Sequence, residues 1–354
     1  MTESTTRLPE PWDSWVLEML GSALPGESFA DCGNCAMCTG RQGLPAQLYF
    51  DSTTRCCTYR PRLSNFMAGM LLLSEDPDSE FGRNSLAERI DMGEAGLLGV
   101  MTGPAYQAIY GQARDVAFGR ASSLRCPHQA DDANCGIHKF RPPVCFTWYC
   151  KYERAAVGQA LWRGVYETLS LAEHAVSLWC LEKMGIHARR GIAALGELNP
   201  SFSAARLDHR RDEPGERETW GGWYGREAEF YAQCARHAAG LEWNEVLGIG
   251  GQELALRAEH ARDLARRHED SSLPRALRAG EFQVTNTREG KAWLVAYNAY
   301  DPLEVDPDLV TFIARCDGRD LESIIAGHLA SGGRRPDRIL LRTLLDMGIL
   351  EPDQ

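Results

Sequence analysis

The sequence predicts a mainly α-helical protein with a small α+β part. Three observations lead to this prediction. Several long segments carry apolar residues every three or four positions, nine of the twelve cysteines fall between positions 32 and 150, and the end of the chain combines strand-like with short helical segments. At 354 residues the chain is long enough for more than one domain. We expect a Cys-rich domain at 1–155, a helical bracing region at 156–270 and a compact final unit at 271–354.

The helices are expected in chain order. A short amphipathic helix in the first 30 residues ends at Gly21, and two more lie in the Cys-rich part, in "PRLSNFMAGMLLLSE" and "TGPAYQAIYGQARDV". In the second of these, Tyr106, Ile109 and Tyr110 share one face. The clearest helix covers 152–185 and stops at Gly185. A connector punctuated by Pro and Gly is expected at 201–222, followed by helical pattern at 223–246 and 251–268.

The last part of the chain predicts a hairpin followed by three helices. The strands cover 281–286 and 291–297 around a turn with Gly290. The helices cover roughly 307–316, 321–330 and 336–347, because Asp306-Pro307, Asp320 and Pro336 are typical helix starts and Gly348 is a typical stop. This order is typical of a small winged-helix-like unit.

Composition and charge exclude some classes of function. The net charge of −11 argues against a nucleic-acid partner, which needs a surface rich in Lys and Arg. No apolar run is long enough to span a bilayer, and the start lacks a basic segment followed by an apolar one, so we expect a cytoplasmic protein without a membrane partner. In a reducing cytosol, clustered cysteines indicate metal ligands or redox chemistry before disulfides.

The stretch "FADCGNCAMCTG" places Cys32, Cys35 and Cys38 at two steps of three residues. This Cys-x2-Cys-x2-Cys spacing suits three corners of a [4Fe–4S] cluster, with a fourth thiolate from elsewhere in the chain. A tetrahedral zinc site would use only two of these thiols from one loop, so iron is the better prediction. Zinc stays open, because the third thiol could serve a second zinc ion or no metal.

A second block, "RCPHQADDANCGIHKFRPPVCFTWYC", carries Cys126, Cys135, Cys145 and Cys150. Four thiols and two imidazoles within 26 residues indicate a metal site, although the spacing matches no zinc finger. Thiolates are already in excess here, so we expect His128 and His138 to make hydrogen bonds rather than to ligate a metal.

The adjacent Cys56 and Cys57 complete the set of nine. These nine thiols divide most simply as four, four and one, although a single site with structural thiols around it stays open. All nine are candidate cofactor-binding residues, and the predicted metal ligands are Cys32, Cys35, Cys38, Cys57, Cys126, Cys135, Cys145 and Cys150. The other cysteines, Cys180, Cys234 and Cys316, are expected to be small buried core residues. Trp148, Tyr149, Tyr152 and Trp162 either shield a cluster from water or belong to the core.

The cysteine array resembles the CxxCxxCC family of zinc- or iron-chelating proteins, which is related to the iron–sulfur flagellin lysine-N-methylases. Its distal motif matches Cys126-Pro127, Cys135-Gly136-Ile137-His138, Arg141-Pro142, Cys145 and Cys150. The proximal motif departs from the pattern, because Thr39 stands where a paired Cys is expected and the pair comes later, at 56–57. The resemblance covers about 29–155 and implies a bound metal or cluster.

The final unit is similar to the PqqD-like winged-helix domains that hold leader peptides during ribosomal peptide maturation. The similarity is carried by the hairpin, by Asn298, by Cys316-Asp317-Gly318-Arg319 and by a last helix before Gly348-Ile349-Leu350. It implies that residues 281–350 hold a peptide or protein substrate by strand addition. A packing or dimerisation module is the alternative for this unit.

Together these features favour an iron–sulfur or iron-binding protein, with one or two clusters, that modifies a peptide or protein by redox or group-transfer chemistry, of natural-product or flagellin type. An open iron position could also take S-adenosylmethionine. Two alternatives lack catalysis: a structural zinc-binding interaction module, and a metallochaperone or metal store. Catalytic residues, substrate and oligomeric state are not fixed by the sequence.

Overall fold

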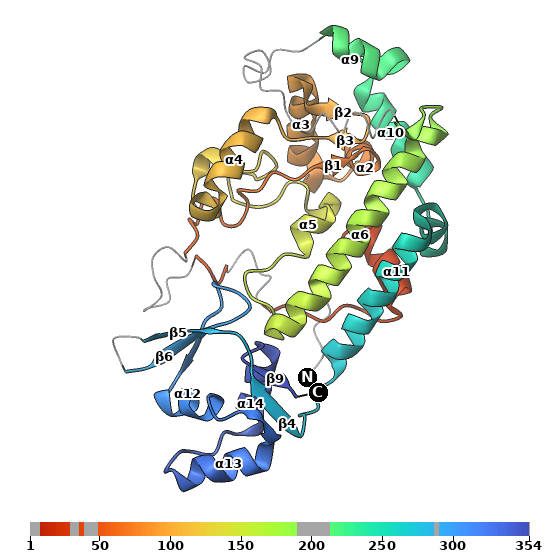
Figure 1. Cartoon of the computed structure of the whole chain (residues 1–354). Helices are drawn as coiled ribbons and strands as arrows, with labels where there is room; N and C mark the ends of the chain where they lie inside the picture. Colours follow the sequence, from red (N-terminus) through yellow and green to blue (C-terminus); the bar gives the residue numbers. More distant parts are fainter. Residues whose placement is uncertain (1–7, 29–34, 39–48, 190–212, 287–289, 354) are drawn as a thin grey trace.

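The computed structural model describes residues 8–28, 35–38, 49–189, 213–286 and 290–353. It is 55% helical with 10% strand in small three-stranded sheets, which confirms the predicted class of a mainly α protein with a small α+β part. Figure 1 shows two long helices as the spine of the molecule, with the Cys-rich segments beside them and the C-terminal unit at one end. None of the helices in these ranges is both long and apolar enough to cross a membrane.

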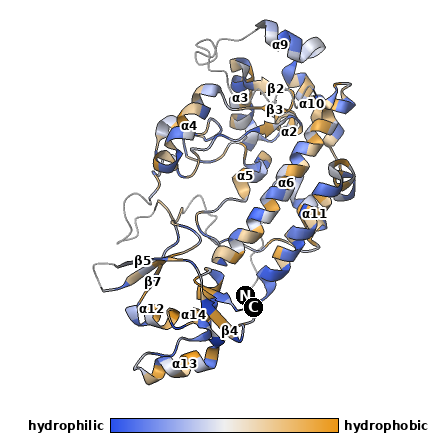
Figure 2. Cartoon of the chain, in the orientation of Figure 1, coloured by the Kyte–Doolittle hydropathy of each residue, from blue (hydrophilic) through white to orange (hydrophobic). Residues whose placement is uncertain are grey.

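The spine is formed by α6 (Ala155–Lys183) and α11 (Trp243–Glu269), which run side by side (Figure 1). Gly164 allows the close approach, because a Cβ there would lie 2.6 Å from Leu264 Cδ1. Both helices alternate between hydrophobic and hydrophilic residues along their length (Figure 2), as expected for helices that bury one face. The first helix, α1 (Trp12–Leu20), packs on α11 and ends at Gly21, as predicted.

A second helical pair, α2 (Asn65–Leu73) and α10 (Glu227–Ala238), packs beside α6. Gly69 is required at this contact, since a Cβ there would overlap the carbonyl of Tyr231. Asn65 Nδ2 donates to the carbonyl of Ser177 on α6 at 3.0 Å, which ties the pairs together. These helices and α1 share one hydrophobic core, so the predicted Cys-rich and bracing regions are packed around a common interior.

Shorter elements carry the Cys-rich segments. They are α3 (Glu80–Arg89), α4 (Pro104–Ala117), α5 (Pro143–Phe146) and a small antiparallel sheet of β1 (Leu63–Ser64), β2 (Ala95–Gly96) and β3 (Gly99–Val100) in the order β1-β3-β2. The helix predicted from "TGPAYQAIYGQARDV" is present as α4. Its predicted apolar face is only partly right, because Tyr106 is buried but Ile109 is 55% exposed.

Two predictions between α6 and the C-terminal unit need correction. The expected connector contains a helix, α9 (Glu213–Trp220), while the part before residue 213 lies outside the described residues. The expected break near "GIGG" is present as a kink inside α11, because Gly251 has non-helical dihedral angles (φ 66°, ψ −157°). The helical pattern expected at 223–246 is wrong as one continuous segment, because the chain turns between α10 and α11, where Gly240 has φ 78° and Glu242 forms a capping box with Glu245.

The C-terminal unit has its own core and two three-stranded sheets. The predicted hairpin is confirmed as β5 (Gln283–Asn286) and β6 (Ala292–Val295), and β7 (Leu303–Val305) extends it in the order β5-β6-β7. The three predicted helices are α12 (Pro307–Ile313), α13 (Leu321–Ala330) and α14 (Arg338–Asp346). The sequence did not predict the second sheet, with order β8-β4-β9, formed by β4 (Ala276–Ala279), β8 (Asp317–Asp320) and β9 (Leu350–Pro352).

Candidate metal centre

The eleven cysteines in the described residues include no disulfide. Cys180, Cys234 and Cys316 are 0%, 0% and 4% exposed in hydrophobic cores, which confirms that they are core residues. Cys32 lies outside the described residues. The other eight candidates come from three stretches, 35–38, 56–57 and 126–150, and the fold brings thiols from these stretches together in two sets.

One set of thiols, the Cys145 group, consists of Cys57, Cys126, Cys135 and Cys145. Burial raises the pKa of Cys145 well above its usual value, and the neighbouring Cys126, Cys135 and Cys57 raise it further. Burial likewise raises the pKa of Cys126 to about 12, with smaller contributions from Cys57 and Cys135. The Cys126 amide donates to the carbonyl of Cys57 at 2.8 Å, which joins the two stretches directly. Four thiols from separate turns therefore share one electrostatic environment.

The loop that carries Cys126 and Cys135 is seated on one face of α3. Gly82 lies against Gly136 so closely that a Cβ on Gly82 would overlap the Gly136 carbonyl. One turn along, Ser85 Oγ lies 2.7 Å from His128 Nδ1, and Arg89 Nη1 lies 3.0 Å from His128 Nε2. Positions 82, 85 and 89 follow the helical repeat, so α3 presents all three contacts on one side.

His128 makes hydrogen bonds, as expected, and is fully buried. Arg89 can only donate, so Nε2 accepts and the ring proton is on Nδ1, where it donates to Ser85 Oγ. The Ser85 hydroxyl then donates to the carbonyl of Gly82 at 3.0 Å. Burial is the main cause that lowers the pKa of His128 to about 3, with Arg89 as the next cause, so the ring is neutral.

Arginines surround the Cys145 group. Hydrogen bonding from Cys56 is the main cause that lowers the pKa of Cys57 to about 7, and Arg141, Arg55 and Arg125 lower it further. The guanidinium groups are held by backbone carbonyls, with Arg55 Nη1 3.2 Å from Ala133 O and Arg141 Nε 3.2 Å from His138 O. Positive charge at this place offsets the charge of thiolates and favours their ionised form.

The second set of thiols, the Cys150 group, consists of Cys35, Cys38 and Cys150. Burial raises the pKa of Cys38 to about 12, and the adjacent Cys35 raises it further. Burial also raises the pKa of Cys150 to about 11, with Cys35 as the next cause. These thiols pack with the buried side chains of Met37 and Phe50 in a small apolar cluster of their own.

Cys56 lies between the two groups. Its side chain packs against the apolar cluster of the Cys150 group, and its thiol is hydrogen-bonded to Cys57 of the Cys145 group. Adjacent cysteines in the chain therefore face neighbouring thiol groups. Among the described cysteines, four therefore form the Cys145 group, three form the Cys150 group, and Cys56 lies between them.

The thiol groups fit a metal in chemistry but not yet in geometry. Across the described ranges, no three His, Cys, Asp or Glu side chains stand in the arrangement of a metal site. The donor set still suits iron or zinc, because it consists of clustered thiols without disulfides, next to arginines that offset their charge. A bound metal would have to draw the sulfur atoms closer together.

The aromatic residues near the thiols have different environments. Trp162 and Tyr152 are buried members of the main core, and Tyr149 packs against it, with its ring 5.0 Å from that of Trp162. Trp148, between Cys145 and Cys150, is 39% exposed and lies edge-on to Phe118 at 5.1 Å. Of these four aromatic residues, only Trp148 is exposed to solvent.

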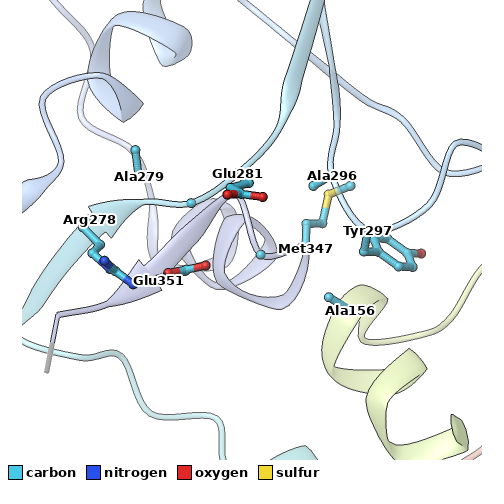
Figure 3. Close-up of a pocket in the computed structure, with 10 residues that line it drawn as sticks. Ala156, Arg278, Ala279, Glu281, Ala296, Tyr297, Met347 and Glu351 are labelled. Atoms are coloured by element: carbon cyan, nitrogen blue, oxygen red, sulfur yellow. Dashed lines mark hydrogen bonds and ion pairs between the residues drawn. The ribbon is translucent and has the colours of Figure 1, made fainter.

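A cavity of about 460 Å³ lies in the C-terminal unit where it meets the start of α6 (Figure 3). Glu281 and Met347 line it, and the ion pair between Arg278 and Glu351, at 2.7 Å, lies at its side. Tyr297 forms the wall toward α6, and its hydroxyl donates to Asp301 Oδ2 at 2.6 Å. The cavity is therefore separated from the Cys150 group by Tyr297 and the loop that follows it.

Comparisons with protein families, with curated proteins and with solved structures find no match for this chain.

Sequence reasoning missed four residues that support the thiols, Ser85, Arg89, Arg55 and Arg125, and it named Arg141 only as part of the distal motif. The arginines next to the cysteines could have been noticed, since Arg55, Arg125 and Arg141 stand within the cysteine-containing stretches. Ser85 and Arg89 gave no local signal, because α3 contains no cysteine and reaches the loop only in the folded chain.

Proposed function

We propose that this chain is a metal-binding protein of iron–sulfur type that acts on a peptide or protein substrate. One observation carries the metal part of the proposal. Seven candidate cysteines, from stretches separated by up to about a hundred residues, gather into two thiol groups without forming disulfides, and Cys56 lies between the groups. Clustered thiols that are kept unpaired by the fold are what a thiolate-bound metal requires.

The Cys145 group would supply four thiolates to one metal or cluster. The Cys150 group would supply Cys35, Cys38 and Cys150 to a second, with Cys32 as the fourth ligand by its spacing. Bound iron–sulfur clusters supply redox chemistry or an electrophilic iron. The chain's own residues hold the thiols in place. The hydrogen bond from Cys56, with smaller contributions from Arg141, Arg55 and Arg125, lowers the pKa of Cys57 to about 7 and favours its thiolate.

The substrate part of the proposal rests on the C-terminal unit. Strand β5 lies at the edge of its sheet in the described residues, and Val284 on that strand is 48% exposed. An exposed strand edge is a template for an extended peptide, which would add a strand by main-chain hydrogen bonds. The cavity in Figure 3 could receive a side chain of such a peptide.

Metal and acid-labile sulfide analysis of anaerobically purified protein, with Mössbauer spectroscopy, tests the metal part. We expect iron and sulfide in stoichiometric amounts and visible charge-transfer absorbance. The Cys145→Ala variant should lose metal, whereas Cys316→Ala, a buried cysteine outside both groups, should keep it. Protein with neither iron nor zinc would refute the proposal.

A structural zinc site is the second candidate, and the Cys145 group favours it. Four thiols are the ligand set of closed, non-catalytic zinc sites. Colourless protein with stoichiometric zinc would select this candidate over the first.

Peptides from short reading frames beside the gene are the probe for the substrate part. We expect such a peptide to protect the amides of β5 from hydrogen exchange, and a Val284→Lys variant to weaken binding. Absence of protection in β5 for a peptide that binds elsewhere would contradict strand addition.

A further inference from the structure

The loop between β6 and β7 of the C-terminal unit contacts the Cys150 segment. Asn298 Nδ2 donates to the carbonyl of Cys150 at 2.8 Å, and Asn298 Oδ1 accepts from the Tyr300 amide at 3.0 Å. One residue after Cys150, Lys151 Nζ lies 3.0 Å from Asp301 Oδ1, and its side chain is only 4% exposed. Loop 298–301 therefore contacts the backbone of Cys150 and the side chain of Lys151. We call this contact between the loop and residues 150–151 the junction.

The same loop supplies an aromatic wall. The ring of Tyr300 lies 5.5 Å from that of Phe50 and 6.5 Å from that of Trp148. Phe118 contacts both of these, at 5.5 Å from Phe50 and 5.1 Å from Trp148, so the four rings form a closed cycle of contacts. Phe50 is 6% exposed and its amide donates to the carbonyl of Met37, which lies between Cys35 and Cys38.

The Cys145 group is supported differently. Its loop is held by Gly82, Ser85 and Arg89 of α3, in the N-terminal half of the chain. The contacts of loop 298–301 thus distinguish one thiol group from the other. A residue from the C-terminal unit completes the surroundings of Cys150, while α3 completes those of Cys126 and Cys135.

We propose that Asn298 and Tyr300 are positioning residues of the Cys150 group. Asn298 fixes the backbone at Cys150, and Tyr300 closes the aromatic wall over Cys35 and Cys38. This deepens the proposed function and rests on it for the role of the metal. Because β6 and β7 flank loop 298–301, a peptide held by the sheet is coupled to the Cys150 group, and that group's occupancy is coupled to the sheet in return.

Residue-resolved alkylation of metal-free protein tests the positioning roles. Iodoacetamide labelling followed by mass spectrometry gives a rate for each cysteine. In Tyr300→Ala we expect Cys35, Cys38 and Cys150 to react about tenfold faster through local opening, with Cys126, Cys135 and Cys145 unchanged. Tyr300→Phe keeps the ring and should react like the wild type, and Ile339→Ala, at a 79% exposed position on α14, is the matched control in the same unit.

Asn298→Asp is the second variant, because it keeps an acceptor for the Tyr300 amide but loses the donor to Cys150. We expect faster alkylation of Cys150 above all. Unchanged rates in both variants, or an equal rise at all cysteines, would overturn the proposal. Should Tyr300→Ala fail to fold, Lys151→Met tests the same contact by removing the ion pair with Asp301. We again expect faster alkylation of Cys35, Cys38 and Cys150 only, and unchanged rates or an equal rise at all cysteines would overturn the proposal.

The measurement is independent of the proposed function, since no metal is present during labelling. If the protein binds no metal but shows the selective rise in alkylation rate, the proposed metal binding is refuted and the positioning roles of Asn298 and Tyr300 are retained. If the protein binds iron but shows no selective rise, the proposed metal binding is retained and the positioning roles are refuted.

Discussion

Arg89 Nη1 lies 3.0 Å from Nε2 of His128 in a buried contact between α3 and the loop of Cys126. The same guanidinium binds Glu94 Oε2 through Nε at 2.7 Å and the carbonyl of Met101 through Nη2 at 2.7 Å. Arg89 thereby joins the thiol loop, the end of α3 and the strand-bearing segment after it. A planar group with five donors is needed for this, which Lys does not provide.

The Arg89–Glu94 pair predicts a large effect on stability. Arg89→Met removes the partner of a carboxylate whose side chain is 7% exposed, and an uncompensated buried charge costs about 3–5 kcal/mol. We expect a lower free energy of unfolding in urea, with part of the loss recovered in the double variant Arg89→Met/Glu94→Gln. Arg226→Met, which breaks the exposed pair with Glu229, should have little effect. Equal effects for the two single variants would contradict the buried role of Arg89.

The contact of Gly82 with Gly136 predicts a steric effect on the thiol loop. Gly82→Ala forces backbone atoms apart, because the added Cβ would overlap the Gly136 carbonyl. We expect a loss of about 1–3 kcal/mol in urea unfolding and faster alkylation of Cys126 and Cys135. Gly111→Ala in α4 is the control: a Cβ there has nothing within 4 Å, so helix propensity should make it neutral or stabilising by up to about 1 kcal/mol. A Gly82→Ala protein with the same free energy of unfolding as the wild type would contradict the close contact between Gly82 and Gly136.

Glu173 predicts a dependence of stability on pH. Burial raises the pKa of this α6 carboxyl from 4.5 to about 7, and Arg62 and Ser64 offset only part of the effect. A pKa raised in the folded state means that the contribution to stability is complete below about pH 4.5 and is lost as the pH rises through about 7.

Glu173→Gln cannot ionise. Its free energy of unfolding should therefore exceed that of the wild type by roughly 2–3 kcal/mol at pH 8, with a much smaller difference at pH 5. Urea unfolding at both pH values measures this. Glu182→Gln, an exposed position on the same helix, should show no such divergence. Parallel pH profiles for the wild type and Glu173→Gln would show that the carboxyl ionises normally.

The Arg154–Asp346 pair predicts how firmly the C-terminal unit is held. Arg154 Nη2 and Nε lie 2.7 Å and 3.1 Å from the two carboxylate oxygens of Asp346, and both side chains are mostly buried. Arg154→Met should cost about 2 kcal/mol and speed hydrogen exchange in β4 and β9, while the core of α6 and α11 stays protected. Arg335→Met, at the exposed pair with Glu322 in the same unit but outside β4 and β9, should leave this exchange unchanged. Uniform acceleration across the chain would point to global destabilisation instead.

The predictable elements were those with a strong local signal. The spacing of Leu161, Val165, Leu169 and their successors fixes α6, and Asp320 caps α13 by accepting from the Ser323 amide, as the sequence indicated. Three glycines near 250 indicated a break, and Gly251 forms it as a kink inside α11. The errors arose where the local signal was incomplete: the helical pattern ran on through 223–246, yet the chain turns at Gly240 between α10 and α11.

By itself, the sequence determined that this protein is mainly helical, that its thiols cluster between 32 and 150, and that a hairpin and three helices close the chain. These follow from periodicity, capping and spacing, which act over a few residues. Tertiary structure alone decided which thiols are neighbours, that α3 seats the Cys126 loop, and that Asn298 reaches Cys150. Such contacts join residues up to 148 positions apart, and only the packing of the helices determines them.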